Sequence, residues 1–267
     1  MIQIGAGSMG GALLRSWIDA GILDRDASAV VDPRPSPDTE AMITAAGITL
    51  NPAQDRAYDV CVLAVKPQQF STVLPALVWP DIENTLFMSI AAGITADETA
   101  NLLKTNNPSP RVLRTMPSLP AKVRRGVSLL ADHQGLKAAD REMGAALMAA
   151  AGAVHWCKDE DQLDRLMGVT GCGPAFVFRV VEALEEAARD QGADPDDARV
   201  LAAETVVAAA RLLEADGRDA GELRAAVTSP GGTTAAGLDV LNERGLVPSF
   251  VAAVAAAYRR AKELAGG

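Results

Sequence analysis

Apolar and polar positions in the first half of the chain follow two alternating periods. Short runs rich in β-branched residues are each followed by a stretch in which apolar residues recur at helical spacing. This rhythm is typical of βαβ units and predicts a parallel sheet of about seven or eight strands with helices packed on it. The expected strands are residues 1–5, 29–32, 60–65, 85–90, 111–115, 127–130 and 154–156, and the expected helices are residues 8–20, 38–46, 68–77, 96–103 and 138–150.

The pattern after Asp159 is helical throughout. The expected helices are residues 162–169, 174–191, 195–215, 220–227, 234–243 and 248–264. Residues 200–213 and 250–258 are apolar on more than one face, which a bundle of this size cannot cover by itself. We therefore expect a homodimer or a larger assembly of dimers. The domain boundary is placed near Cys157, with residues 1–157 forming one domain and residues 158–267 the other.

Residues 5–10 form a GxGxxG motif that follows an expected strand and opens an expected helix. In that setting the motif indicates a dinucleotide-binding Rossmann domain: the glycines allow a tight turn, close approach of the pyrophosphate and close helix packing, and the helix start supplies N–H donors. The residues assigned to the cofactor are Gly5, Ala6, Gly7, Ser8, Met9 and Gly10. The predicted fold class is α/β, a Rossmann-type doubly wound sheet followed by an all-α helical dimerisation domain.

Two charged residues after the second expected strand bear on the choice of cofactor. Asp32 lies 22 residues after Gly10, where an acidic side chain hydrogen-bonds the adenosine ribose and disfavours a 2′-phosphate. Arg34 lies between two prolines and pairs with a 2′-phosphate if the loop turns that way. A third interpretation is that Asp32 only caps a turn before the prolines. The sequence leaves NADH and NADPH both open.

Residues 64–67, Ala-Val-Lys-Pro, end the strand expected at residues 60–65. Ligands of doubly wound sheets bind at the carboxyl edge of the strands, so Lys66 is placed to reach cofactor phosphates or hydroxyls. A lysine before a proline is, however, commonly just an exposed loop residue. The residues assigned to the cofactor here are Ala64, Val65, Lys66 and Pro67.

Composition and charge exclude several functional classes. The chain has 267 residues and a formal net charge of −9, so it repels nucleic-acid backbones and anionic lipid headgroups, and we expect neither nucleic acid nor membrane as a partner. Three cysteines without CxxC spacing argue against a disulfide framework and against a zinc site, and no metal is predicted. The N-terminus carries no basic or long apolar leader, which predicts a soluble cytoplasmic protein.

Two segments of the helical half are too rich in glycine and proline to be helix interiors. These segments are residues 169–176 (VTGCGPAF) and residues 228–235 (TSPGGTTA). In the second segment Gly231 and Gly232 free backbone N–H groups, and Thr233 and Thr234 add hydroxyls at a helix start, which suits a substrate carboxylate. The same pattern also fits a helix start capped by threonine with no ligand.

Proton donors are scarce where the substrate should lie. Residues 159–261 contain no lysine and no histidine, and His133 and His155 are the only histidines of the chain. An enzyme that reduces a ketone usually needs such a donor, whereas an imine binds already protonated and needs only orientation and hydrogen bonding. The composition therefore favours a C=N substrate.

Six segments, in their order along the chain, resemble pyrroline-5-carboxylate reductase. They are residues 5–10 (GAGSMG), 64–68 (AVKPQ), 91–93 (AAG), 114–118 (RTMPS), 171–175 (GCGPA) and 227–234 (VTSPGGTT). The resemblance implies hydride transfer from NADPH or NADH to the C=N carbon of 1-pyrroline-5-carboxylate, giving L-proline. It also implies a Rossmann domain and a helical dimerisation domain, with the active site shared between subunits.

Site residues carried over from this resemblance complete the predicted site. The substrate carboxylate is assigned to Ser229, Gly231, Gly232, Thr233 and Thr234. The Thr234 hydroxyl is expected to face the ring nitrogen and is the predicted catalytic group. Asn51, Lys66 and Ala92 fall where the family contacts the cofactor. The chain departs from the family pattern at Ser8 (usually Asn), Cys172 (usually Ser), Phe176 (usually Tyr) and residues 118–119 (usually Asn-Thr).

Three rival functions remain at this stage. A β-hydroxyacid dehydrogenase shares the two-domain plan but needs a catalytic lysine, which residues 162–191 lack. A related reductase of a six-membered cyclic imine, such as piperideine carboxylate, differs only in pocket size, which the sequence does not report. A nicotinamide-binding regulator would bind the cofactor without turnover.

Overall fold

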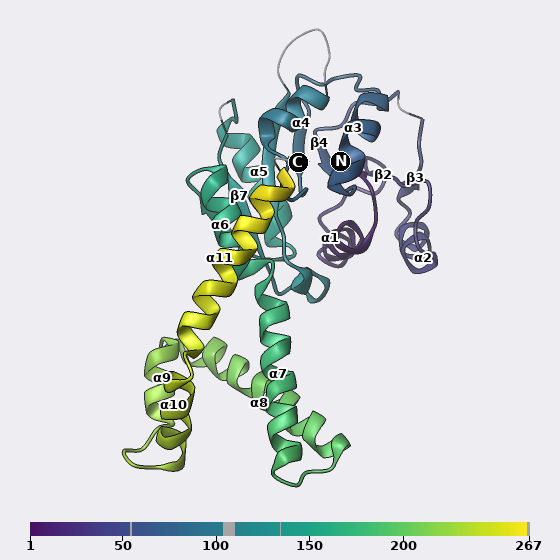
Figure 1. The fold of residues 1–267 in the computed structure, drawn as a ribbon. Coiled ribbons are helices and arrows are strands. Elements are labelled where there is room, and N and C mark those ends of the chain that lie inside the picture. Colours follow the sequence, from purple (N-terminus) through teal and green to yellow (C-terminus); the bar gives the residue numbers. More distant parts are fainter. Residues whose placement is uncertain (54, 104–109, 134, 266–267) are drawn as a thin grey trace. The chain divides into compact units, whose positions relative to one another are not determined.

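The computed structural model describes the chain except for residues 54, 104–109, 134 and 266–267, and it divides into two compact units (Figure 1). One unit comprises Met1–Cys172 with Ala255–Gly267, and the other is Gly173–Val254. The predicted division at residue 157 lies earlier in the chain than this one. Helix α6 (Glu160–Thr170) belongs to the first unit, because its Leu163 is buried in a cluster with residues of the sheet. The boundary between the units therefore follows α6 and does not precede it.

An eight-stranded sheet organises the first unit, in the order β3-β2-β1-β4-β5-β6-β7-β8. The strands are β1 (Ile2–Ile4), β2 (Ala29–Val31), β3 (Thr49–Leu50), β4 (Val60–Leu63), β5 (Leu86–Ser89), β6 (Arg111–Met116), β7 (Gly126–Ala131) and β8 (Gly152–Cys157). Strands β1 to β6 are parallel, as predicted, whereas β7 pairs antiparallel with β6. The predicted fold class, a Rossmann-type sheet followed by a helical dimerisation domain, is confirmed.

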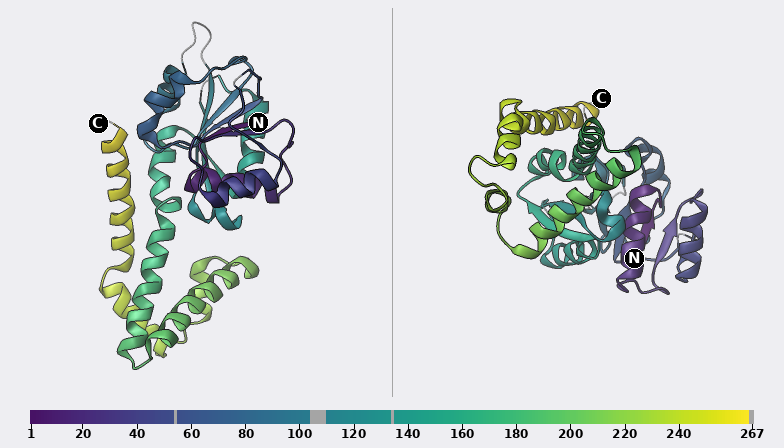
Figure 2. Two further views of the ribbon diagram at one scale, coloured as in Figure 1. Left: turned by 90° about the vertical axis from the view of Figure 1, so that its right-hand side faces the viewer. Right: turned by 90° about the horizontal axis from the view of Figure 1, so that it is seen from below.

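Helices cover both faces of this sheet (Figure 2). The helices are α1 (Ser8–Asp19), α2 (Pro37–Ala45), α3 (Phe70–Val73), α4 (Ala96–Leu102) and α5 (Ala138–Ala149). The first core cluster lies under α1, α2 and α5 and contains Leu14, Ile43 and Met148, and the Trp17 indole N–H donates to Leu147 O at 2.7 Å to join α1 to α5. The second cluster, under α3 and α4, contains Phe70.

A buried arginine fixes α6 to the sheet. Arg114, on β6, is 1% exposed and donates to Glu160 Oε2 at 3.0 Å and to Asp164 Oδ1 at 2.5 Å. Glu160 also accepts from the backbone N–H of Ala96, at the start of α4. A buried guanidinium with two carboxylates avoids the cost of an unpaired charge, so these bonds hold α6 within the first unit.

The second unit is a set of helices with few buried residues. Its helices are α7 (Gly173–Asp190), α8 (Pro195–Asp216), α9 (Ala220–Ala226), α10 (Thr233–Glu243) and the first part of α11 (Leu246–Ala265). Asp194 caps α8 by accepting from Asp196 N at 3.0 Å, and Gly217 ends the helix in the left-handed conformation. Ala198 and Ala202 are the buried residues of this unit. Its apolar side chains are exposed, among them Phe178 (61%), Leu201 (57%) and Val251 (65%).

Several predicted elements differ from those observed. Strand β3 was not expected, because two residues are too few for a periodic pattern. The helix expected at residues 68–77 is three short pieces: η1 (Pro67–Gln69), α3 and η2 (Leu74–Ala76). Pro75 lacks the N–H that a continuous helix needs there. The connection from β6 to β7 holds only η3 (Leu119–Val123), too short for the crossover of a parallel pair.

One helical stretch, Glu160–Asp190, has the length and apolar composition of a membrane span, with a mean hydropathy of 1.3. A second candidate, Thr233–Glu243 with Leu246–Glu263, is bent by 46°. Only 6% of the apolar window in the first stretch is buried within this chain. These helices therefore carry an apolar face that one chain leaves uncovered.

Candidate active site

The glycine loop leads from β1 into α1 with the geometry that a dinucleotide requires. Gly5 has φ +91°, and a Cβ there would lie 2.8 Å from Ala64 O, so glycine is needed at this close crossing. A Cβ at Gly10 would lie 2.6 Å from Gly5 O, whereas one at Gly7 would meet nothing within 4 Å. Gly7 therefore leaves open space on the side from which a phosphate approaches.

The start of α1 has free hydrogen-bond donors. The N-cap residue is Gly7, which has no side chain that could cap the helix. Within the described part of the chain, the backbone N–H groups of Ser8, Met9 and Gly10 have no acceptor, since the first helical bond runs from Gly11 N to Gly7 O at 2.7 Å. Uncapped N–H groups and the helix dipole together favour an anion at this end of α1.

Asp32 is anchored to the backbone on both carboxylate oxygens. Ala6 N donates to Oδ2 at 2.8 Å, and Arg34 N donates to Oδ1 at 2.9 Å. The carboxylate therefore ties the end of β2 to the glycine loop and caps the turn before the prolines. Each oxygen keeps a second lone pair, so a ribose hydroxyl has an acceptor here as well.

Asn51, directly after β3, forms hydrogen bonds with the same turn. It adopts φ +51°, and its side-chain amide bonds the backbone of Asp32 in both directions: Asp32 N donates to Oδ1, and Nδ2 donates to Asp32 O, each at 2.9 Å. In this structure Asn51 shapes the end of β2 beside the glycine loop. Its predicted contact with the cofactor stays a prediction.

A hollow of about 710 Å³ lies beside the glycine loop and contains several of the predicted cofactor residues. Its lining includes Ala6, Gly7, Ser8, Asp32 and Arg34 from the predicted set. It also includes residues that sequence reasoning missed, namely Gly11, Ala12, Arg15, Ser36, Asp38, Thr39, Met42 and Lys122. Nothing in the local pattern around Arg15 or Lys122 signals this location, because folding alone brings them to the loop.

The residues at the ends of β4 and β5 lie further along the same carboxyl edge. Ala64 N donates to Ile4 O at 2.7 Å, which holds Ala64 beside the glycine loop. Lys66 is exposed, and Pro67 and Ala92 line a second hollow of about 480 Å³. The structure thus brings most of the predicted cofactor residues to one edge of the sheet, where a dinucleotide binds in folds of this kind.

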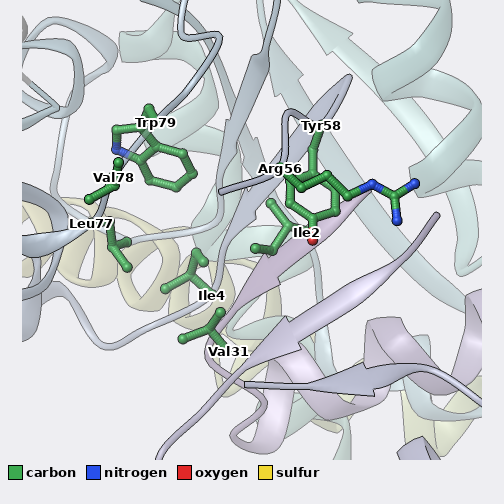
Figure 3. Close-up of a pocket in the computed structure, with 8 residues that line it drawn as sticks. All are labelled: Ile2, Ile4, Val31, Arg56, Tyr58, Leu77, Val78 and Trp79. Carbon is green, nitrogen blue, oxygen red and sulfur yellow. The ribbon is translucent and has the colours of Figure 1, made fainter. Parts of the chain in front are cut away.

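A third cavity, shown in Figure 3, lies between β1, β2 and the segment after η2. Its lining is Ile2, Ile4, Val31, Arg56, Tyr58, Leu77, Val78 and Trp79. The volume of about 10 Å³ holds one water molecule at most. It is a packing gap in the second core cluster.

The second unit presents the predicted substrate loop at the start of α10. Gly231 has φ +68°, and a Cβ at Gly232 would lie 2.4 Å from Ser229 Oγ. Gly232, not a threonine, is the N-cap, and no side chain caps this helix. Among the described residues, the N–H groups of Thr233 and Thr234 have no acceptor, because the first helical bond runs from Ala236 N to Gly232 O. The threonine-capped alternative is therefore wrong, and the loop presents donors suited to an anion.

The structure gives three of the residues that depart from the family pattern a defined setting. Ser118 is buried and accepts from Val127 N at 2.8 Å, so it supports the turn into β7. Cys172 is partly exposed at the break between α6 and α7, and Phe176 stacks edge-on against Phe250 with ring centroids 6.3 Å apart.

Burial raises the pKa of the Cys61 thiol well above its usual value, so that cysteine is not a nucleophile.

Two family models match separate parts of the chain. Residues 160–264 match the model described as pyrroline-5-carboxylate reductase dimerisation. Residues 2–93 match the model described as NADP oxidoreductase coenzyme F420-dependent.

Similar proteins cover almost the whole chain. The pyrroline-5-carboxylate reductase of Methanosarcina acetivorans is 37% identical over 264 residues, which is 98% of this chain and 96% of that protein. The pyrroline-5-carboxylate reductase of Pisum sativum is 32% identical over 98% of this chain and 94% of that protein. Among solved structures, a pyrroline-5-carboxylate reductase from Coxiella burnetii has a TM-score of 0.88 at 32% identity, covering 98% of this chain and 97% of that one. A Plasmodium falciparum pyrroline carboxylate reductase solved with NADP bound shares the fold, with a TM-score of 0.82 at 23% identity over 99% and 97% of the two chains.

Proposed function

The chain belongs to the pyrroline-5-carboxylate reductase family, and on that premise we propose how its residues carry out the reaction. It is an NAD(P)-dependent oxidoreductase that reduces the C=N bond of 1-pyrroline-5-carboxylate to L-proline, the final step of proline biosynthesis. The observation that carries this function is the similarity to the Methanosarcina enzyme along 98% of the chain.

The cofactor is proposed to bind along the carboxyl edge of the sheet. The residues present fit a dinucleotide: Gly5 allows a crossing that a Cβ would block, and the start of α1 has free N–H donors for the pyrophosphate. Asp32 offers an acceptor to the adenosine ribose, and Pro67 and Ala92 line the hollow at the ends of β4 and β5. When bound, the reduced nicotinamide supplies the hydride.

The substrate carboxylate is proposed to bind at the start of α10. Ser229, the backbone of residues 231–234 and the helix dipole would hold it without any cationic side chain. The Thr234 hydroxyl is proposed to hydrogen-bond the ring nitrogen. The nitrogen of a protonated imine already carries its proton and the carbon receives the hydride, so no separate proton donor is needed. Orientation and charge are therefore the main tasks left to these residues.

The working enzyme is proposed to be a homodimer or a larger assembly of dimers, as the dimerisation-domain match supports. Its proposed location is the cytoplasm. An apolar groove of about 520 Å³ in the second unit has Val206, Leu213 and Leu223 in its wall, and 46% of Leu213 is exposed in a single chain. Apolar surface of this extent is stable in water only when covered, and a second copy of the chain is the proposed cover. A monodisperse, active monomer in solution scattering would contradict the proposal.

The function is tested by following the absorbance of NADH and NADPH, in parallel, as the purified protein is mixed with 1-pyrroline-5-carboxylate. Oxidation of at least one cofactor, with proline formed in equal amount, is the expected result. Binding of both cofactors without oxidation would favour the nicotinamide-binding regulator. A higher kcat/KM for the six-membered piperideine carboxylate would shift the assignment to that imine.

A further inference from the structure

The hollow beside the glycine loop has more positive charge than an adenosine ribose requires. Three cationic side chains line it: Arg15 from α1, Arg34 from the turn after β2, and Lys122 from η3. In the part of the chain that the structure describes, none of the three makes an ion pair or a side-chain hydrogen bond. Three cations around one hollow, none of them paired with a carboxylate of the described residues, favour an anionic ligand group.

The long-range packing of η3 against α1 brings Lys122 to this hollow. The Ser16 hydroxyl donates to Ala121 O at 2.8 Å, and both residues are buried. Arg15 and Lys122 each directly neighbour one member of this pair in sequence. The end of η3 is held by Arg124, which adopts the left-handed conformation with φ +57°. Lys122 therefore belongs to a fixed turn of the fold.

Two carboxylates also line the hollow. Both Asp32 oxygens accept backbone N–H groups, which offsets part of the negative charge of this residue. Asp38 lies exposed in the first turn of α2. The hydroxyls of Ser36 and Thr39 lie 2.8 Å apart at the same helix start and add further hydrogen-bonding groups. The lining thus has three positive and two negative side chains, and one of the two carboxylates, Asp32, already accepts two backbone N–H groups.

We propose that this hollow binds the 2′-phosphate of NADPH and that Lys122 is a specificity-determining residue for NADPH over NADH. The proposal rests on the proposed function, since it assumes that the adenosine end of the cofactor lies beside Asp32. The three cations and two carboxylates leave the lining with a net charge of +1, opposite in sign to the charge of about −1.5 to −2 that a 2′-phosphate carries. The interaction is charge-assisted, so a neutral side chain at position 122 weakens it.

Binding of 2′,5′-ADP and of 5′-AMP to the full-length protein, measured by calorimetry, tests the proposal without any turnover. The two probes differ only in the 2′-phosphate. The wild type should bind 2′,5′-ADP more tightly, by about tenfold or more. Lys122→Gln should reduce this preference about fivefold or more, and Lys122→Glu should reduce it further because it adds a repulsive charge. The NADPH to NADH ratio of kcat/KM should fall in the same order.

Lys137→Gln is the matched control, because it removes the same charge from an exposed lysine at the start of α5 that does not line the hollow. It should leave the preference for 2′,5′-ADP intact. Equal affinity of the wild type for the two probes, or an unaltered preference in both Lys122 variants, would overturn the proposal. Preferential binding of 2′,5′-ADP without any reduction of 1-pyrroline-5-carboxylate would instead overturn the proposed function and leave this inference standing.

Discussion

Thr234→Val tests where the substrate lies. Valine keeps the β-branched shape and deletes only the hydroxyl, at the second residue of α10. The Thr234 side chain is exposed and makes no hydrogen bond with the described residues, so no buried partner loses a bond. The free energy of unfolding should therefore change by no more than about 0.5 kcal/mol.

The catalytic effect of the same change should be much larger. If the hydroxyl bonds the charged ring nitrogen, its loss costs about 1.5 to 3 kcal/mol, which lowers kcat/KM for 1-pyrroline-5-carboxylate roughly 10- to 150-fold. Cofactor affinity should stay as it is, because the residues that form the glycine loop and its hollow all belong to the other unit. We therefore expect a nearly unchanged free energy of unfolding together with a much lower kcat/KM.

Steady-state kinetics with varied imine, cofactor titration by fluorescence and thermal melts together measure kcat/KM, cofactor affinity and the stability of the fold. Thr205→Val is a suitable control, since it makes the same replacement on an exposed face of α8, where the Thr205 hydroxyl only donates to Leu201 O at 2.7 Å. The control should retain normal kcat/KM. A Thr234→Val enzyme with near-normal kcat/KM would show that the substrate binds elsewhere, even with the overall reaction correct.

Three further changes probe neighbouring parts of the site. Gly232→Ala places a Cβ 2.4 Å from Ser229 Oγ, so the KM for the imine should rise roughly 5- to 100-fold, and an unaltered KM in substrate titrations would refute a role for this loop. Asp32→Ser removes a charge that repels a 2′-phosphate, so the NADPH to NADH ratio of kcat/KM should rise about fivefold; an equal ratio would mean that this turn does not contact the ribose. Cys172→Ser should change kcat and melting temperature little, since we interpret Cys172 as a small packing group, and a large loss of activity would point to chemistry at the thiol.

Much of the first unit was predictable because its determinants are local. The period of apolar residues depends on neighbours a few positions apart, so it predicted seven of the eight strands and the order of the helices. The glycine loop is equally local: β1, the turn and α1 are consecutive, and Gly5 and Gly10 are required by contacts within that short segment and with Ala64. The order of the family motifs along the chain likewise needs no structure.

Features that depend on distant partners were not predictable in this way. Strand β3 has two residues and exists because it pairs with β2, and the antiparallel direction of β7 follows from the short connection through η3. The assignment of α6 to the first unit depends on Arg114, which is paired with two carboxylates far along the chain. Each of these features leaves fewer backbone N–H and C=O groups without a hydrogen bond, or fewer buried charges without a partner. Which groups need a partner depends on the whole fold.

The site residues also fall into those that local sequence identifies and those that only the tertiary structure brings together. Sequence alone identified the glycine loop and the loop at residues 231–234, because the backbone N–H groups of consecutive residues carry their chemistry. It also identified Asp32, by its spacing from the glycine loop. The presence of Lys122 and Arg15 in one hollow was decided only by tertiary structure. The packing of η3 against α1 includes a buried hydrogen bond from Ser16 to Ala121, 105 positions apart, and no periodicity in a sequence encodes which two surfaces will meet.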